Sequence, residues 1–269
     1  MARQELLRWL PEASADLADL LDPGRGPLDR PNRSEIFGPE RFAQHGRSLA
    51  ETHAAAPGRS ASAAFFPRLR DNIRILREAY RFIGSQASTG YDITPAAEWL
   101  LDNFHLVETQ LHEIRSGLPR SYFRDLPVLQ NEPLVGLPRV YGVAWAFVAH
   151  TDSAFDEKTL VGFLQAYEEI RELTLGELWA LPTTLRVVLI ENLRRLAERT
   201  AATKGARAVA NLCADRVDET TPARLDAVFS LLARRGCGDA FIAQIAQQVQ
   251  DRRSPDDAPM LAWLSRIAP

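Results

Sequence analysis

The sequence predicts an all-α protein, an irregular bundle of about ten helices that also contains one proline-rich ordered segment. Apolar residues recur at spacings of three and four along most of the chain, which is typical of amphipathic helices. Convincing period-two alternation, the pattern of half-buried strands, is scarce. The chain has 269 residues, of which 46% are hydrophobic and 25% are charged, so it is long and apolar enough to bury a core.

Residues 1–35 are expected to form an N-terminal helix and a loop, followed by a helical domain over residues 36–269. The N-terminal helix is predicted over residues 3–21, with a break or kink at Pro11. Its charged residues alternate with apolar ones, which indicates an amphipathic helix and not a signal peptide. Residues 22–34 are rich in glycine and proline and are therefore predicted to be the loop.

Three helices are predicted in the first half of the domain, over residues 40–53, 63–86 and 95–115. Pro39 and Pro95 fit first turns, where a helix makes no use of the missing N–H. Thr94 can cap the free N–H groups of the third helix. The stretch rich in alanine, glycine and serine that ends at Ser62 is expected to be a flexible connection.

Residues 117–139, which we call the strap, contain four prolines and two glycines. No regular helix is expected at that density of helix breakers. The strap is also rich in large apolar side chains, namely Tyr122, Phe123, Leu126, Leu129, Leu134 and Val135. It is therefore predicted to be an ordered loop that crosses the helices, because a free linker would be more polar.

Helices are also predicted over residues 140–150, 157–172, 183–203, 239–252 and 259–267, and from Pro222 to near Gly236. Asp156 and Thr221 precede two of these helices as start signals. Thr174 and Glu177 have the spacing of a capping box. The helix that this box opens contains Pro182, where a kink or an interruption is expected.

Composition argues against several functional classes. The net charge of -3, from 32 basic and 35 acidic residues, disfavours a nucleic-acid-binding protein, which usually has a basic excess. The two cysteines are expected to be reduced and buried. The longest apolar stretch, residues 140–148, is about half as long as a membrane span, so the segment is predicted to be soluble.

The helix predicted over residues 95–115 carries the best candidates for chemistry. Glu98, Asp102 and His105 lie at helical spacings on the face opposite its apolar stripe. Carboxylates and imidazoles on one face suit acid–base catalysis or metal binding, but a solvated helix face has the same composition. The solvated face is favoured, since neither an HExxH pattern nor a zinc-ligand spacing occurs. No catalytic residue, metal or cofactor is therefore predicted.

Two further acidic residues lie on strongly apolar helices. Glu177 has the capping role, and Glu191 can pair with Arg194 or Arg195 at helical spacing. Such residues belong to buried structural networks more often than to active sites. From the residues alone, the chain is a helical domain without a P-loop or a GxGxxG motif.

Three sequence motifs are notable for their order and spacing. They are Thr94–Phe104 (TPAAEWLLDNF), Leu118–Pro127 (LPRSYFRDLP) and Leu173–Pro182 (LTLGELWALP). In this order they resemble the N-terminal cytoplasmic region of the cyclic β-1,2-glucan synthase family. The resemblance extends from about residue 36 to the C-terminus, and it includes shorter motifs such as Pro138–Gly142 (PRVYG).

The resemblance implies a segment of a long inner-membrane enzyme. Family members combine a glycosyltransferase domain that uses UDP-glucose with membrane spans and a phosphorylase-like region. This segment would precede the transferase, on the cytoplasmic face of the inner membrane, with the other modules of the polypeptide as its partners. No catalytic residue of the family has a matching position here, so the full-length protein and not this segment is expected to be the glycosyltransferase.

Two hypotheses remain open. In the first, the segment is a non-catalytic scaffold that contacts the other modules through residues 122–141. Tyr122, Arg139 and Tyr141 are its candidate contacts, because tyrosine and arginine are common at interface hot spots. In the second, it is a β-1,2-glucan-binding or other sugar-binding module, in which Trp99 or Trp179 stacks on a sugar beside Glu98, Asp102 or His105. The scaffold is favoured, since no convergent pair of acids is present.

Overall fold

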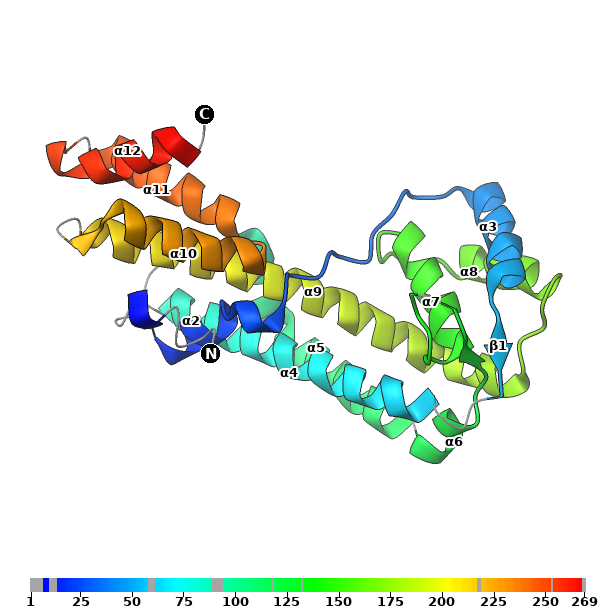
Figure 1. The fold of residues 1–269 in the computed structure, drawn as a ribbon. Coiled ribbons are helices and arrows are strands. Elements are labelled where there is room, and N and C mark those ends of the chain that lie inside the picture. The colour runs from blue at the N-terminus through cyan, green and yellow to red at the C-terminus, as the bar shows by residue number, and fades with distance from the viewer. Residues whose placement is uncertain are drawn as a thin grey trace. The chain divides into compact units, whose positions relative to one another are not determined.

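The structure, a computed structural model, describes residues 7–9, 14–57, 61–88, 94–117, 119–131, 133–216, 219–252 and 254–267. Helices dominate these residues, and a two-stranded antiparallel sheet is the only sheet among them (Figure 1). The all-α fold class is therefore confirmed.

The chain divides into two compact units. Unit 1 comprises Met1–Arg30, Leu76–Leu101 and Arg195–Pro269, and unit 2 comprises Pro31–Ile75 and Asp102–Arg194. Three long helices contribute residues to both units, α4 (Ala61–Ser88), α5 (Pro95–Gly117) and α9 (Leu175–Asp215). The division predicted at residue 35 stays a prediction.

Unit 1 also contains α2 (Ala15–Leu20), η1 (Pro23–Arg25), α10 (Pro222–Arg235), α11 (Gly238–Arg252), η3 (Pro255–Asp257) and α12 (Ala258–Ile267). Helices α10, α11 and α12 pack on one another around the fully buried side chains of Phe241 and Trp263. The buried guanidinium of Arg235 holds residues 20–26 to this core. It donates to the carbonyl of Gly26 at 2.9 Å and forms an ion pair with Glu198.

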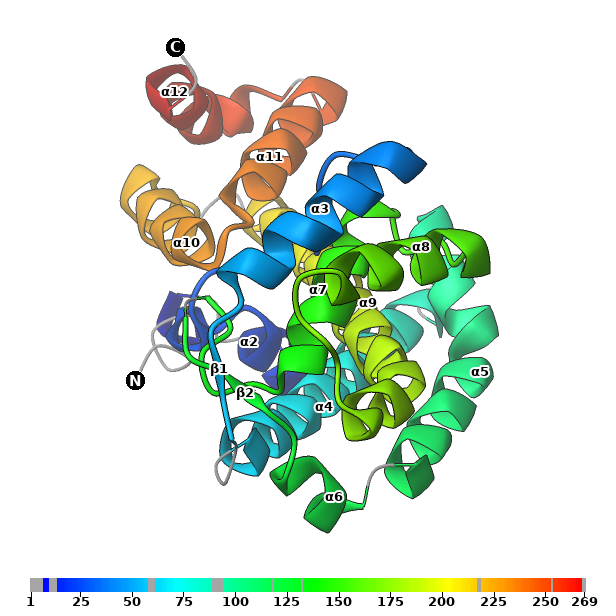
Figure 2. The same cartoon turned by 90° about the vertical axis from the view of Figure 1, so that its right-hand side faces the viewer.

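Unit 2 also contains α3 (Pro39–Thr52), β1 (Ala55–Ala56), α6 (Arg120–Arg124), β2 (Val128–Leu129), α7 (Arg139–His150) and α8 (Glu157–Glu168). Helices α3 and α8 lie side by side (Figure 2). A Cβ atom at Gly46 would lie 2.7 Å from the carbonyl oxygen of Phe163, so glycine permits their close approach. Phe42, Phe147 and Phe163 fill the core beside this contact.

The described residues of the strap, 117, 119–131 and 133–139, are ordered, and they differ from the prediction in two respects. Residues 120–124 form the short helix α6, and β2 pairs with β1, with Ala55 opposite Leu129. The expectation of a flexible connection up to Ser62 is thus wrong for β1, while residues 58–60 lie outside the described residues. Burial of Phe123 and Leu129 explains the order, since it holds the strap against the helices.

Three predicted helix starts are confirmed by their capping bonds. The side chains of Thr94, Asp156 and Thr221 accept from backbone N–H groups three residues later at 3.3, 2.7 and 3.2 Å. The helix after Asp156 ends at Glu168, earlier than the predicted residue 172. The predicted Pro11 break lies outside the described residues.

No interruption occurs at Pro182, because α9 is one helix from Leu175 to Asp215. Pro182 is exposed. Water can therefore hydrate the carbonyl of Leu178, which loses its helical partner there. This explains why the helix continues through the proline.

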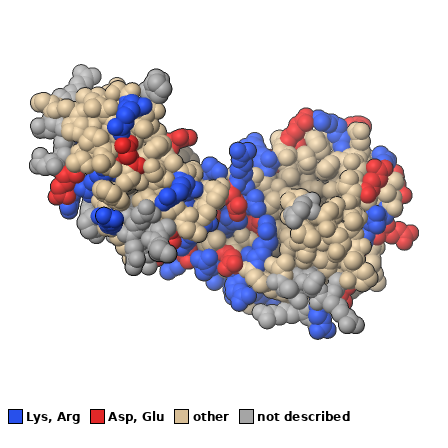
Figure 3. All heavy atoms as spheres, viewed as in Figure 1, with Lys and Arg blue, Asp and Glu red and all other residues tan. Residues whose placement is uncertain are grey.

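Neither cysteine forms a disulfide, and both are buried, as predicted. Among the helices within the described ranges, none has the length and apolarity needed to cross a membrane. Figure 3 shows basic and acidic side chains interspersed, often next to one another, among uncharged areas.

Candidate functional site

The first turn of α9 is fixed by the capping box that the sequence predicts. The Thr174 hydroxyl accepts from Glu177 N at 3.2 Å and donates to Glu177 Oε2 at 2.9 Å. Glu177 Oε2 also accepts from Thr174 N at 2.9 Å. These bonds satisfy N–H groups that lack a helical carbonyl, so the start of α9 is held in one conformation.

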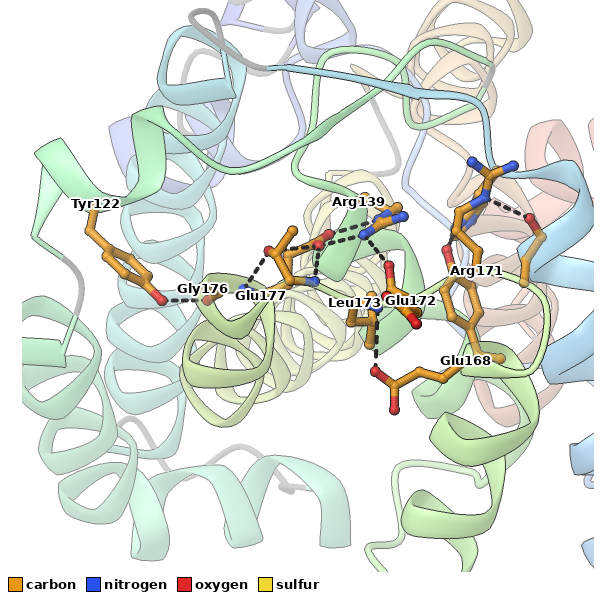
Figure 4. Close-up of polar contacts among 12 residues, drawn as sticks. Tyr122, Arg139, Glu168, Arg171, Glu172, Leu173, Gly176 and Glu177 are labelled. Carbon is orange, nitrogen blue, oxygen red and sulfur yellow. Dashed lines mark hydrogen bonds and ion pairs between the residues drawn. The ribbon is translucent and has the colours of Figure 1, made fainter.

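Arg139, at the start of α7, ties the strap to the same carboxylate (Figure 4). Its Nε donates to Glu177 Oε1 at 2.8 Å, and its Nη2 donates to the carbonyl oxygen of Glu172 at 3.0 Å. Nη2 also bonds Glu177 Oε2, and the two side chains are only 6% and 0% exposed. Burial lowers the pKa of Arg139, but the hydrogen bonds and charge of Glu177 outweigh this effect and raise it.

A pocket of about 480 Å³ adjoins this ion pair, with Tyr122, Arg139 and Arg171 in its wall. The Tyr122 hydroxyl donates to the carbonyl of Gly176, and Arg171 Nε donates to the carbonyl of Ala50 at 3.0 Å (Figure 4). The pocket therefore combines fixed guanidinium groups with a partly exposed phenol. Such a lining suits a carboxylate or a hydroxyl-rich group.

An exposed apolar surface covers the first turns of α9 beside the pocket. We call it the α9 start surface and define it by Tyr122, Leu175, Leu178 and Trp179, which are 37%, 71%, 37% and 76% exposed. Leu175 and Trp179 are one helical turn apart and share a face. Large apolar side chains grouped on a fixed backbone are typical of interaction surfaces.

The structure places three candidate residues, Tyr122, Arg139 and Trp179, around the start of α9. Tyr141 lies elsewhere in unit 2 and is buried, with its hydroxyl donating to Glu191 Oε2 at 2.7 Å. Burial raises the pKa of this hydroxyl, which therefore stays protonated and remains a donor.

The four candidates on α5 are divided between the units. Glu98 and Trp99 belong to unit 1, and Asp102 and His105 belong to unit 2. All four side chains are exposed, Trp99 to 53%. Within the part of the chain that the structure describes, no group of three His, Cys, Asp or Glu side chains is placed to hold a metal ion.

Glu191 lies at the centre of a network that helical spacing does not reveal. Its carboxylate accepts from Arg68 Nε at 2.9 Å, Arg68 Nη2 at 2.6 Å and Asn72 Nδ2 at 2.9 Å. Arg194 Nε reaches the network through Asn72 Oδ1, at 3.0 Å. With the Tyr141 hydroxyl, these donors satisfy a carboxylate on a side chain that is 1% exposed.

His53 lies at the end of α3 and is 7% exposed. Its Nδ1 is 2.9 Å from the Tyr167 hydroxyl. Burial, reinforced by the positive charges of Arg139 and Arg171, lowers the pKa of His53 to about 4, against a smaller opposing effect of Glu177. His53 is therefore neutral at neutral pH.

Acidification is expected to destabilise the protein through His53. An unfolded histidine has a pKa of about 6.5, so the unfolded state binds the proton first as the pH falls. The contribution is fully present above that value and is lost as the pH falls to about 4, at a cost of roughly 3 kcal/mol. Urea unfolding of the wild type and His53→Gln between pH 7 and pH 4 measures it.

The stability difference between the wild type and His53→Gln should shrink as the pH falls. The exposed His105 provides the control, since His105→Gln should retain the wild-type pH dependence. Parallel curves for the wild type and His53→Gln would contradict the assignment.

Comparison of the sequence with known proteins identifies a relative of this chain. Over 240 residues the chain is 38% identical to the cyclic β-(1,2)-glucan synthase NdvB of Rhizobium meliloti. The resemblance to a cyclic β-1,2-glucan synthase is confirmed. The match covers 86% of this chain and 8% of the Rhizobium synthase, so most of that synthase has no counterpart here. No protein-family model matches the chain.

Proposed function

We propose that this chain is the non-catalytic scaffold segment of a cyclic β-1,2-glucan synthase. The full-length protein would make cyclic glucan from UDP-glucose at the inner membrane. This segment would lie at the cytoplasmic face and bind the transferase or phosphorylase-like modules of the same polypeptide. The identity of 38% to a synthase of which the chain spans only 8% supports this proposal, because a short segment of a long protein has neighbouring modules to contact.

The observation that carries the proposal is the exposure of Leu175 and Trp179 at the start of α9. They are 71% and 76% exposed, whereas Glu177, on the same turns, is fully buried. The capping box and the Arg139 ion pair hold this turn in place, so binding would not have to order it. The adjoining pocket offers Arg171 and Tyr122 for polar contacts around an apolar centre.

The test measures association with the Rhizobium synthase from which the matching segment has been deleted. We expect the wild-type chain to bind and Trp179→Ala to weaken binding at least about tenfold, the usual loss for a tryptophan at an interface centre. Trp99→Ala is the matched control, since Trp99 is also exposed, to 53%, and it should bind like the wild type. Absence of binding, or equal binding by Trp179→Ala, would overturn the proposal.

The exposed Trp99 also supports a second candidate function, a sugar-binding module on the 95–115 helix. An exposed indole next in sequence to the exposed carboxylate of Glu98 can stack on a sugar whose hydroxyls bond the acid. Calorimetric titration with linear and cyclic β-1,2-glucans and with UDP-glucose distinguishes the two functions. Micromolar binding that Trp99→Ala abolishes would favour the sugar-binding module.

A further inference from the structure

A second cavity, of about 470 Å³, lies within unit 1 and has no part in the proposed docking. One face of α9 supplies most of its wall, and α11 and the residues next to the α4–α5 connection supply the rest. The lining residues are basic, hydroxyl-bearing or amide-bearing, apart from one alanine. None of them is acidic and none is aromatic.

The positive charges come from Arg199, Lys204 and Arg207. Their spacing places them on neighbouring rows of one helix face. Arg207 is exposed and forms no ion pair with any residue of the described ranges. The three basic side chains thus line one cavity, and its wall contains no carboxylate.

Arg199 supplies a second, independent observation. Its Nε–H is buried and has no hydrogen-bond partner. By contrast, the buried guanidinium groups of Arg139 and Arg235 both face carboxylates.

The amide groups of the wall add further donors. Asn211 Oδ1 accepts from Gln244 Nε2 and Gln248 Nε2, each at 3.0 Å. This arrangement engages the Asn211 acceptor and leaves its Nδ2 amino group as a donor. Thr200 and Thr203 add hydroxyl groups from the same face of α9. The wall can therefore bind both a strong acceptor and ordinary hydroxyl groups.

We propose that this cavity binds the phosphate ester of a sugar or a similar polyol. A dianionic phosphate matches the guanidinium and ammonium groups, and hydroxyl and amide groups match the hydroxyls of the polyol. The lining contains no aromatic ring on which a nucleobase would stack. Its volume falls in the range of about 300–1,000 Å³ that is usual for small-molecule sites.

The test is calorimetric titration of the whole chain with glucose 6-phosphate, inorganic phosphate, glucose and UDP. We expect glucose 6-phosphate to bind best, inorganic phosphate to bind more weakly and glucose not to bind. Binding should weaken as salt is added, because the attraction is largely between charges. Arg199→Gln and Arg207→Gln should each lower the affinity at least about tenfold.

Arg186→Gln is the matched control, because it removes the same charge from a part of α9 that belongs to unit 2. Circular dichroism melting of each variant separates a lost ligand contact from a lost fold, and the exposed Arg207 can be replaced without unfolding. The proposal would be overturned if neither glucose 6-phosphate nor inorganic phosphate bound. It would also be overturned if Arg199→Gln, Arg207→Gln and Arg186→Gln bound glucose 6-phosphate with equal affinity. Preference for UDP over glucose 6-phosphate would overturn the polyol assignment.

Discussion

Glu191→Gln is expected to lower the free energy of unfolding by about 1–3 kcal/mol, the usual cost of leaving buried donors without a charged acceptor. The loss stays below that of a fully buried ion pair, because the Arg68 side chain is 38% exposed and water can hydrate its freed charge. The Glu191 side chain is 1% exposed and accepts from Arg68, Asn72 and the Tyr141 hydroxyl. Glutamine has nearly the same shape, but it lacks the charge and directs an NH₂ group at these donors. Urea unfolding followed by circular dichroism gives the difference directly.

The control for this loss is an exposed ion pair between α5 and the same long helix, α9. Arg186 of α9 pairs with Glu113 at 3.4 Å, and the two side chains are 43% and 45% exposed. Since an exposed pair contributes about 0–1 kcal/mol, Glu113→Gln should leave the stability almost unchanged. Equal losses for Glu113→Gln and Glu191→Gln would refute the special role of the buried network.

Arg139→Met is expected to lower the free energy of unfolding by about 3–5 kcal/mol, because both side chains of its ion pair with Glu177 are buried. Methionine keeps much of the aliphatic length of arginine, but it leaves the fully buried Glu177 carboxylate without its bidentate partner. The carbonyl of Glu172 also loses a donor. Chemical unfolding measures the loss.

The double variant Arg139→Met/Glu177→Met tests the cause of that loss. Replacing both members of a buried pair by apolar residues is often nearly neutral. Here the capping bonds between Thr174 and Glu177 are lost as well, at about 1 kcal/mol. The double variant should therefore be more stable than Arg139→Met. A double variant that is less stable would show that the charge pair is not the source of the effect.

Helix caps and other features that depend on a few neighbouring residues could be predicted from the sequence. Thr94, Asp156 and Thr221 cap helices as expected, and Thr174 and Glu177 form their box, because each of these bonds closes within three residues. Pro182 shows the limit of such signals. Whether a proline interrupts a helix depends on access of water to the freed carbonyl, and tertiary structure decides that.

Contacts between distant segments could not be predicted. Arg68 and Glu191 are 123 residues apart, and Arg139 and Glu177 are 38 apart. Helical spacing therefore suggested only near neighbours as partners of Glu191. The division of α5 between two units could not be predicted from the sequence either, because Trp99 and Asp102 lie on consecutive turns of one helix.

The Glu177 carboxylate couples the motion of the strap to that of the first turn of α9. It receives bonds from the first backbone N–H of its capping box and from the guanidinium that anchors the strap. Release of the strap and fraying of α9 would both leave this carboxylate unsatisfied, so the two openings should occur together as one cooperative event. The pocket and the α9 start surface would then form together and be lost together. A partner that binds one would slow the amide hydrogen exchange of both.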